Sequence, residues 1–223
     1  MIITEKKSNL KFNVRKDTYD EEVVRECFGS SYFKENIKYC RDDIVLDVGA
    51  NIGAYAIRVS SLVQVVHSFE PDIDNYNLAK ENLSLNSITN VHLNNSALIS
   101  SDKTTIDFYV NGKANKGAHS CCPIRGREKI TVPAKMFSTV VKEIKPTIVK
   151  MDIEGAEWDI ITANNTDWSS VRILMFEWHP NILKDKTFEK RDKIESILNK
   201  HFDTLVLPNK TKAWTELIYT LKD

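Results

Sequence analysis

The sequence predicts an α/β protein built on a doubly wound, mostly parallel sheet. Short apolar runs rich in β-branched residues alternate with amphipathic segments along most of the 223 residues. This alternation indicates parallel strands joined by right-handed crossovers, because two parallel strands can be connected only by a segment long enough to hold a helix. Hydrophobic residues make up 42% of the chain and charged residues 28%, which suffices for a core and is ordinary for a folded protein.

Residues 44–94 predict strand, helix, strand, helix and strand in that order. The run Ile44-Val45-Leu46-Asp47-Val48 is apolar and partly β-branched, which is typical of a strand buried on both faces. Pro71 and Asp72 are residues that commonly open a helix. The expected elements are strands at 44–49, 64–70 and 90–94 and helices at 52–62 and 72–86.

The remainder of the chain continues the alternation after an interruption. A loop-rich insertion at about 111–130, containing three glycines and Pro123, separates expected strands at 105–110 and 129–132. The further elements are helices at 137–145, 157–163 and 187–201, strands at 147–152 and 172–177, and a closing β-hairpin of 204–207 with 216–221. We expect residues 1–223 to form a single domain with an N-terminal extension at 1–40.

Composition excludes several classes of protein. Lys+Arg and Asp+Glu both number 31, so the formal net charge is zero, whereas a protein that binds nucleic acid by bulk electrostatics usually carries a basic excess. The sequence has neither a transmembrane run of about 18 apolar residues nor the apolar stretch of a signal peptide. The four cysteines lack the spacing of a zinc site or a disulfide scaffold. We therefore expect a soluble, cytoplasmic protein.

The turn after the first strand is a candidate binding site, because ligands of doubly wound sheets sit at the carboxyl ends of the strands. Gly49 and Gly53 permit a sharp turn and a close approach of a ligand to the backbone. A dinucleotide-binding G-x-G-x-x-G motif would place its second glycine at Asn51, where a side chain obstructs a pyrophosphate. The spacing favours a nucleoside without phosphates, such as S-adenosylmethionine, whose positive charges also suit Asp47. Glu70, at the end of the second strand, can accept hydrogen bonds from ribose hydroxyls in either kind of cofactor.

Four segments carry a recognisable pattern, namely Val45–Gly53, Phe69–Pro71, Val149–Glu157 and Phe176–Pro180. Together they resemble the FkbM-type family of class I S-adenosylmethionine-dependent methyltransferases. The resemblance implies a Rossmann-like sheet of seven strands with an antiparallel C-terminal strand. It also implies S-adenosylmethionine as methyl donor and a hydroxyl of a small molecule, sugar or glycolipid-type compound as acceptor.

The resemblance further implies roles for single residues. The expected cofactor site comprises Asp47, Gly49, Ala50, Asn51 and Gly53 around the methionine part, Glu70 and Pro71 at the ribose, Ser96 and Ala97 at the adenine, and Asp152. Lys150 stands where the family often has an aliphatic residue, and we interpret it as a packing change without functional content.

Methyl transfer to a hydroxyl needs a base within hydrogen-bond reach, because the attacking oxygen loses its proton. The candidate catalytic residues are Asp152, Glu154 and His179, which follow the fourth and fifth core strands, and Glu157, Glu177 and Trp178 are expected to contact the substrate. Favourable charge at a helix N-terminus is the alternative for Glu154 and Glu157. A divalent metal on the carboxylates is chemically reasonable but not favoured, and the other histidines, His119 among them, are expected to be structural.

Three other functions remain open. They are a methyltransferase acting on nucleic acid or protein, a non-catalytic nucleoside-binding module, and a nicotinamide oxidoreductase. The zero net charge is an average, since residues 111–135 carry six basic residues against one acidic residue and residues 152–177 carry the reverse. The basic segment would suit a locally acidic acceptor, although two salt-bridging surface patches would explain the same charges.

Overall fold

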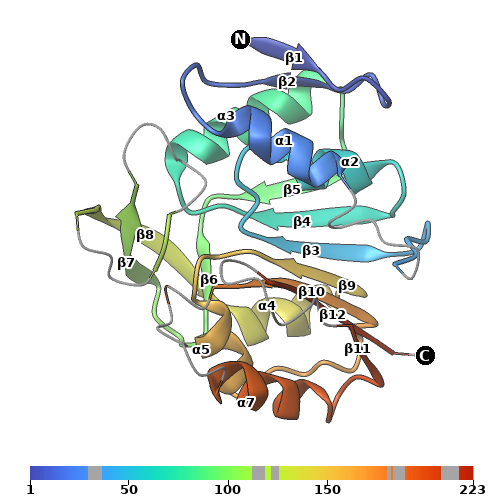
Figure 1. The fold of residues 1–223 in the computed structure, drawn as a ribbon, viewed down its shortest axis with the longest axis vertical. Coiled ribbons are helices and arrows are strands. Elements are labelled where there is room, and N and C mark those ends of the chain that lie inside the picture. Colours follow the sequence, from blue (N-terminus) through green and yellow to red (C-terminus); the bar gives the residue numbers. More distant parts are fainter. Residues whose placement is uncertain are drawn as a thin grey trace.

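The computed structural model of the protein describes residues 1–29, 37–111, 119–121, 126–179, 182, 189–206 and 216–222, and of 204–206 and 216–221 only the backbone. Its centre is a seven-stranded sheet with the order β11-β12-β10-β9-β3-β4-β5 (Figure 1). The strands are β3 (Ile44–Val48), β4 (Val65–Phe69), β5 (Val91–Asn94), β9 (Ile148–Met151), β10 (Ile173–Trp178), β11 (Thr204–Val206) and β12 (Glu216–Leu221). Five neighbouring strands of this sheet, β10, β9, β3, β4 and β5, are parallel, and β12 runs antiparallel to both β10 and β11.

Helices cover both faces of this sheet, which confirms the predicted doubly wound α/β fold (Figure 1). One face carries α1 (Asp20–Phe28), α2 (Ala54–Ser60) and α3 (Ile73–Leu85), and the other carries α4 (Phe137–Ile144), α5 (Glu157–Thr162) and α7 (Glu189–Leu198). Successive strand residues point to opposite faces, so Val45 joins the first hydrophobic cluster and Leu46 the second. Among the described residues, none of the helices has the length and apolar character needed to cross a membrane.

The N-terminal segment has more structure than the sequence predicts. Strands β1 (Ile2–Thr4) and β2 (Lys11–Asn13) pair antiparallel and lie against α3 (Figure 1). The side-chain oxygens of Asn82 and Asn86 accept hydrogen bonds from the backbone N–H groups of Asn13 and Lys11, at 2.6 and 2.8 Å. Side chains of α3 therefore replace a third strand as partners of this hairpin.

A separate three-stranded sheet has the order β6-β8-β7 and follows β5 in the chain. Its strands are β6 (Ala97–Ile99), β7 (Thr105–Val110) and β8 (Glu128–Met136). Strand β6 was not predicted, and β8 extends beyond the predicted end at residue 132, through Pro133, which is in register with Thr105. Of the expected insertion at 111–130, residues 112–118 and 122–125 lie outside the described residues.

The register of the central sheet brings four strand ends to one level. Val48 pairs with both Phe69 and Met151, and Phe69 pairs with Asn94, so β3, β4, β5 and β9 end together. The chain leaves β3 toward β4 and β5 and later returns to β9 on the other side of β3, so the winding reverses between β3 and β9. A reversal of this kind leaves a crevice at the carboxyl ends of the strands, where doubly wound proteins bind ligands.

Candidate functional site

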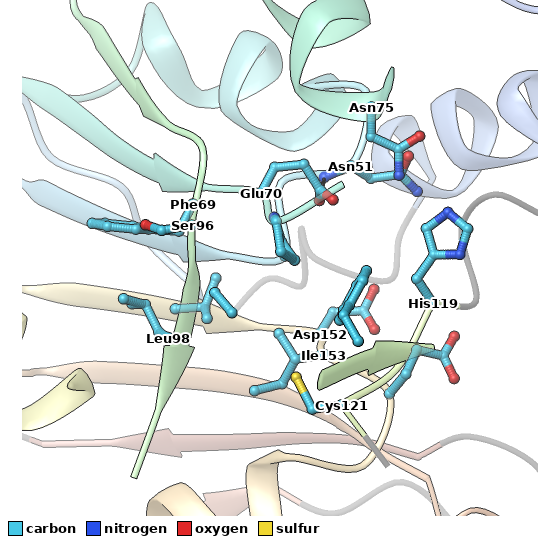
Figure 2. Close-up of a pocket in the computed structure, with 16 residues that line it drawn as sticks. Asn51, Phe69, Glu70, Asn75, Ser96, Leu98, His119, Cys121, Asp152 and Ile153 are labelled. Atoms are coloured by element: carbon cyan, nitrogen blue, oxygen red, sulfur yellow. Dashed lines mark hydrogen bonds between the residues drawn. The ribbon is translucent and has the colours of Figure 1, made fainter. Parts of the chain in front are cut away.

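A cleft that is partly open to solvent lies at this reversal (Figure 2). Its walls come from the turns after β3, β4 and β9 and from the β6-β8-β7 sheet. The lining residues are Val48, Gly49, Asn51, Phe69, Glu70, Pro71, Asn75, Ser96, Ala97, Leu98, Phe108, His119, Cys121, Asp152, Ile153 and Glu154. The cleft thus combines apolar walls with a few polar groups, which is typical of small-molecule sites.

The turn after β3 requires glycine at its first position. Gly49 has φ +84°, and the N–H groups of Gly49 and Ala50 both donate to the carbonyl of Phe69 at 3.0 Å. A Cβ on Gly49 would lie 1.9 Å from the carbonyl oxygen of Asp152, so β3 and the end of β9 approach closely only because no side chain intervenes. Gly53 has φ +81° at the start of α2.

Glu70 organises the same turn from the end of β4. Its carboxylate accepts hydrogen bonds from the backbone N–H groups of Asn51 at 2.7 Å and Asp72 at 2.9 Å. Burial raises the pKa of the Glu70 carboxyl from 4.5 to about 7, although these N–H groups act in the opposite direction. Glu70 is thus a buried acid held in a fixed position at the edge of the cleft.

Two polar atoms in the lining lack partners within the protein. Asn51 Oδ1 and Ser96 Oγ are buried, and neither makes a hydrogen bond with the residues that the structure describes. Buried polar groups in folded proteins almost always have a partner. These two atoms, on opposite sides of Glu70 in Figure 2, therefore indicate a ligand that offers hydrogen-bonding groups to both.

Asp47 and Lys150 form a buried pair beneath the cleft. Asp47 is fully buried and Lys150 is 4% exposed, and Lys150 Nζ lies 3.4 Å from Asp47 Oδ1. Lys150 also donates to the carbonyl of Gly49 at 2.9 Å and lies 3.9 Å from Asp152 Oδ2. Our interpretation of Lys150 as a packing change is therefore wrong, because its charge joins the glycine turn to the end of β9. Asp47 faces this lysine and does not line the cleft.

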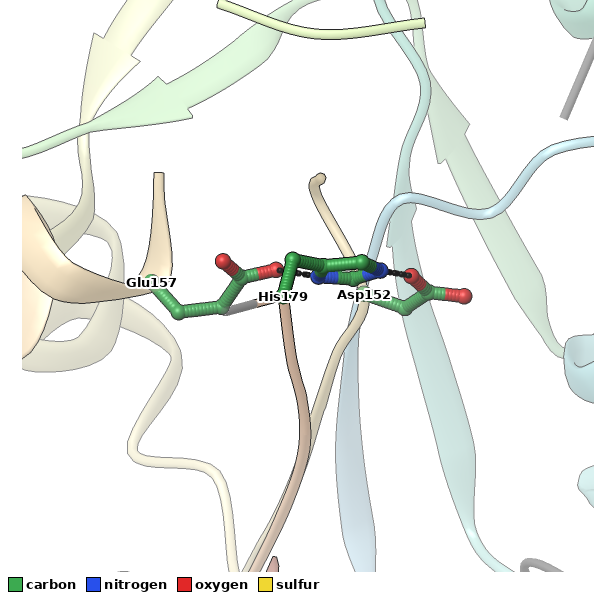
Figure 3. A group of neighbouring side chains, drawn as sticks. All are labelled: Asp152, Glu157 and His179. Atoms are coloured by element: carbon green, nitrogen blue, oxygen red, sulfur yellow. Dashed lines mark ion pairs between the residues drawn. The ribbon is translucent and has the colours of Figure 1, made fainter. Parts of the chain in front are cut away.

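Four carboxylates surround the buried imidazole of His179. Nδ1 lies 3.3 Å from Glu157 Oε1, and Nε2 lies 3.6 Å from Glu154, 3.8 Å from Asp152 and 3.9 Å from Glu177. Figure 3 shows the ring between Glu157 on one side and Asp152 on the other. Burial lowers the pKa of His179, but Glu157, Glu154 and Asp152 raise it more, to about 10.

The loop after β9 presents this cluster to the cleft. Glu154 has φ +54° and lines the cleft. Burial raises the pKa of the Glu154 carboxyl to about 7, although the charge of His179 acts in the opposite direction. Glu157 is fully buried at the start of α5, and its two oxygens accept hydrogen bonds from the N–H groups of Ile153 at 2.9 Å and Gly155 at 2.8 Å. Glu157 therefore holds the loop and the imidazole together.

The structure gathers most of the expected site. Of the residues predicted from the sequence, those in the lining are Gly49, Asn51, Glu70, Pro71, Ser96, Ala97, Asp152 and Glu154. Ala50 and Gly53 are in the turn behind them, and Glu177 and His179 stand behind Asp152 and Glu154. Trp178 is fully buried in the second hydrophobic cluster, so its predicted contact with a substrate is incorrect. The same correction applies to Glu157, which is fully buried and turned toward His179.

His119 lines the cleft although we expected it to be structural. It is 6% exposed, its Nδ1 accepts a hydrogen bond from the N–H of Asn111 at 2.8 Å, and its Nε2 lies 3.7 Å from Asp72 Oδ2. The neighbouring Ser120 pairs with Tyr109 of β7, and the local sequence does not predict that pairing.

We expect the variant Glu70→Gln to change how stability depends on pH. Folding favours the protonated form of Glu70, because its pKa is about 7 in the folded protein and 4.5 ordinarily. The wild type therefore loses stability as the pH rises from 4.5 toward 7, whereas glutamine stays neutral. The free energy of unfolding of Glu70→Gln relative to wild type should rise by about 1 to 3 kcal/mol between pH 5 and 8. Urea unfolding at several pH values measures this, with exposed Glu143→Gln as the control. A difference that is constant with pH would contradict it.

Comparisons with known proteins identify the family and the fold. Residues 47–203 match the model of the methyltransferase FkbM domain. A hexuronic acid methyltransferase, AglP of Haloferax volcanii, is 28% identical over 141 residues, which are 63% of this chain and 58% of that protein. The match thus spans little more than half the length of that relative.

Solved structures share the fold. The precorrin-6y C5,15-methyltransferase of Geobacter metallireducens aligns with a TM-score of 0.51 and 14% identity, covering 95% of this chain and 94% of that one. A 16S rRNA methyltransferase of T. thermophilus, in complex with AdoMet and guanosine, aligns with a TM-score of 0.51 and 11% identity, covering 100% of this chain and 50% of that one. At such identities the likeness shows a common Rossmann-like architecture.

Proposed function

The chain belongs to the FkbM methyltransferase family, and from this we propose that it transfers the methyl group of S-adenosylmethionine to a hydroxyl oxygen of a sugar or related small molecule. The observation that supports this most directly is the cleft at the ends of β3, β4 and β9, with two buried polar atoms that make no hydrogen bond to any described residue. We take residues 1–223 to act as one methyltransferase domain.

The residues of the glycine turn and of β4 fit the cofactor. Gly49 lines the cleft with backbone atoms alone, and the Glu70 carboxylate at the strand end suits two vicinal hydroxyls. Ser96 Oγ and Asn51 Oδ1 can each pair with a polar group of the nucleoside or of the amino-acid part. When bound, S-adenosylmethionine supplies an electrophilic methyl group on a sulfonium. The acidic end of β9 suits that positive charge.

The cluster after β9 and β10 supports the removal of the acceptor's proton. Asp152 and Glu154 line the cleft, and His179 lies behind them within 4 Å of both. In the reaction an O–CH₃ bond forms as the S–CH₃ bond breaks, and the hydroxyl proton goes to this cluster. Alignment of the oxygen opposite the sulfur contributes through proximity, and the proton acceptor contributes about 10² to 10⁴ in rate.

The proposed acceptor carries a negative charge. Arg127 stands at the beginning of β8 close enough to interact electrostatically with Glu154, and its Nη1 is buried without a hydrogen bond to the described residues. The relative from Haloferax volcanii acts on a hexuronic acid by its name. Both observations favour a sugar acid over a neutral sugar.

Calorimetric titration with S-adenosylhomocysteine tests the cofactor. We expect binding by wild type and a loss of at least about tenfold in affinity in Glu70→Ala, because charged hydrogen bonds are lost. Glu143→Ala, which removes an exposed carboxylate outside the cleft, should bind like wild type. Binding of NAD, together with no binding of S-adenosylhomocysteine or S-adenosylmethionine, would overturn the proposal.

A panel of hexuronic acids and neutral hexoses, with S-adenosylhomocysteine formation as the readout, tests the acceptor. A transferred methyl group that survives mild alkali identifies an ether at a hydroxyl. An alkali-labile product would show a methyl ester and would overturn the hydroxyl as acceptor.

A further inference from the structure

The cluster around His179 has a geometry that proton transfer alone does not require. One nitrogen of His179 and one carboxylate oxygen each of Asp152 and Glu157 all lie within 4.8 Å of one another (Figure 3). Ligand atoms about 2.1 Å from a common Mg²⁺ or Mn²⁺ are separated by roughly 3 to 4.2 Å. Small side-chain rotations would therefore bring the three residues onto one cation.

From this arrangement we propose that Asp152, Glu157 and His179 bind one divalent cation of the Mg²⁺ or Mn²⁺ class.

The imidazole is the observation that distinguishes this cluster from a group of acidic side chains. His179 is 7% exposed, and its Nδ1 is buried 3.3 Å from Glu157 Oε1 but makes no hydrogen bond with the residues that the structure describes. A cation here would take the place of the proton on this nitrogen, because histidine binds a metal only in its neutral form and metal binding releases the proton. One imidazole with two carboxylates leaves other coordination positions open, as catalytic metal sites do.

The residues around this cluster hold the Glu157 carboxylate in place and add negative charge, and both would favour a bound cation. Hydrogen bonds from Ile153 and Gly155 fix the Glu157 carboxylate, and each of its oxygens keeps a further lone pair. Glu154 and Glu177 add two carboxylates within 4 Å of the ring. The nearby cation Lys150, whose Nζ lies 3.4 Å from Asp47 and 3.9 Å from Asp152, adds one positive charge beside these carboxylates.

The site would be reached from the cleft. The Asp152 side chain is 31% exposed and Glu154 is 19% exposed, whereas Glu157 and His179 form the closed side. The role of the cation in catalysis rests on the proposed function. A cation at this place would hold the acceptor hydroxyl and lower the pKa of that hydroxyl. Glu154, on the cleft wall, would then take the proton. Binding of the cation itself needs neither cofactor nor acceptor.

Electron paramagnetic resonance of Mn²⁺ added to the metal-stripped full chain tests the site, because bound Mn²⁺ loses its free-ion signal. We expect one Mn²⁺ per chain, displaced by excess Mg²⁺. Asp152→Asn, which changes a partly exposed side chain, should weaken Mn²⁺ binding at least about tenfold, and His179→Gln should do the same. Glu143→Gln serves as the control and should bind like wild type, and circular dichroism verifies that each variant is folded.

Absence of saturable Mn²⁺ binding, or equal binding by Asp152→Asn and wild type, would overturn the proposal. These outcomes are separate from the methyltransferase reaction, which the S-adenosylhomocysteine titration and the acceptor panel test. Transfer that continues in EDTA, together with no Mn²⁺ binding, would reject the cation and leave the proposed function standing.

Discussion

Replacing Gly49 with alanine is expected to destabilise the protein by about 3 kcal/mol or more. The residue has φ +84°, and the new Cβ would lie 1.9 Å from the carbonyl oxygen of Asp152. Backbone strain adds about 1 to 3 kcal/mol, and separating two packed backbone segments adds about as much again. Because the displaced atom belongs to the residue that lines the cleft after β9, we also expect affinity for S-adenosylhomocysteine to fall.

Gly126→Ala provides a matched control for this prediction. Gly126 has φ +86°, nearly the same as Gly49, but a Cβ there would meet no atom of the described residues within 4 Å. This variant should therefore show only the left-handed strain, about 1 to 2 kcal/mol. Urea unfolding of both variants measures the difference. Equal losses would mean that β3 and β9 separate without cost, contrary to the packing described above.

Removal of the Lys150 charge is expected to have a comparably large effect. In Lys150→Met, Asp47 would remain fully buried without its counter-ion, which typically costs about 3 to 5 kcal/mol. Burial already raises the pKa of Asp47 and Lys150 opposes that shift, so the variant should raise this pKa further. Folding then favours protonated Asp47, and the deficit in stability should be small at low pH and grow as the pH rises.

The double variant Asp47→Asn, Lys150→Met separates the pair from the surrounding packing. With both charges removed, stability should recover in part relative to Lys150→Met, and most of the pH dependence should disappear. Thermal and urea unfolding at about pH 5 and pH 8 measure both effects. A deficit that is the same at both pH values would show that lost packing of the lysine stem, and not its charge, is responsible.

The longer strands of the fold could be predicted from the sequence, whereas the strands of three residues in the N-terminal hairpin and β6 could not. The core strands β3, β4, β9 and β10 could be predicted because each is a short and mainly apolar run, as is typical of strands buried on both faces. The hairpin of β1 and β2 could not, since each strand has three residues and its partners are Asn82 and Asn86, some 70 positions away in the chain. The strand β6 is equally short and pairs with β8, from which it is separated by a whole strand.

The site was predictable where a residue directly follows a core strand. Gly49, Glu70 and Asp152 line the cleft because parallel strands end at one edge. The direction of a side chain beyond that point was not predictable, and Trp178 and Glu157 turned out to face the interior. Lys150 carried a signal that we misjudged, since a charged residue in the apolar run 147–151 requires a buried partner, and Asp47 is that partner.

The part of the fold that contributes Phe108 and His119 to the cleft affects how the cleft can change during evolution. These two residues line the cleft from β7 and the segment after it, in a sheet that shares no strand with the central one. Mutations there can reshape one wall while the register that aligns Gly49, Glu70 and Asp152 stays intact. This wall of the cleft and the strand ends that carry Gly49, Glu70 and Asp152 can therefore evolve separately, because they depend on different sheets of one chain.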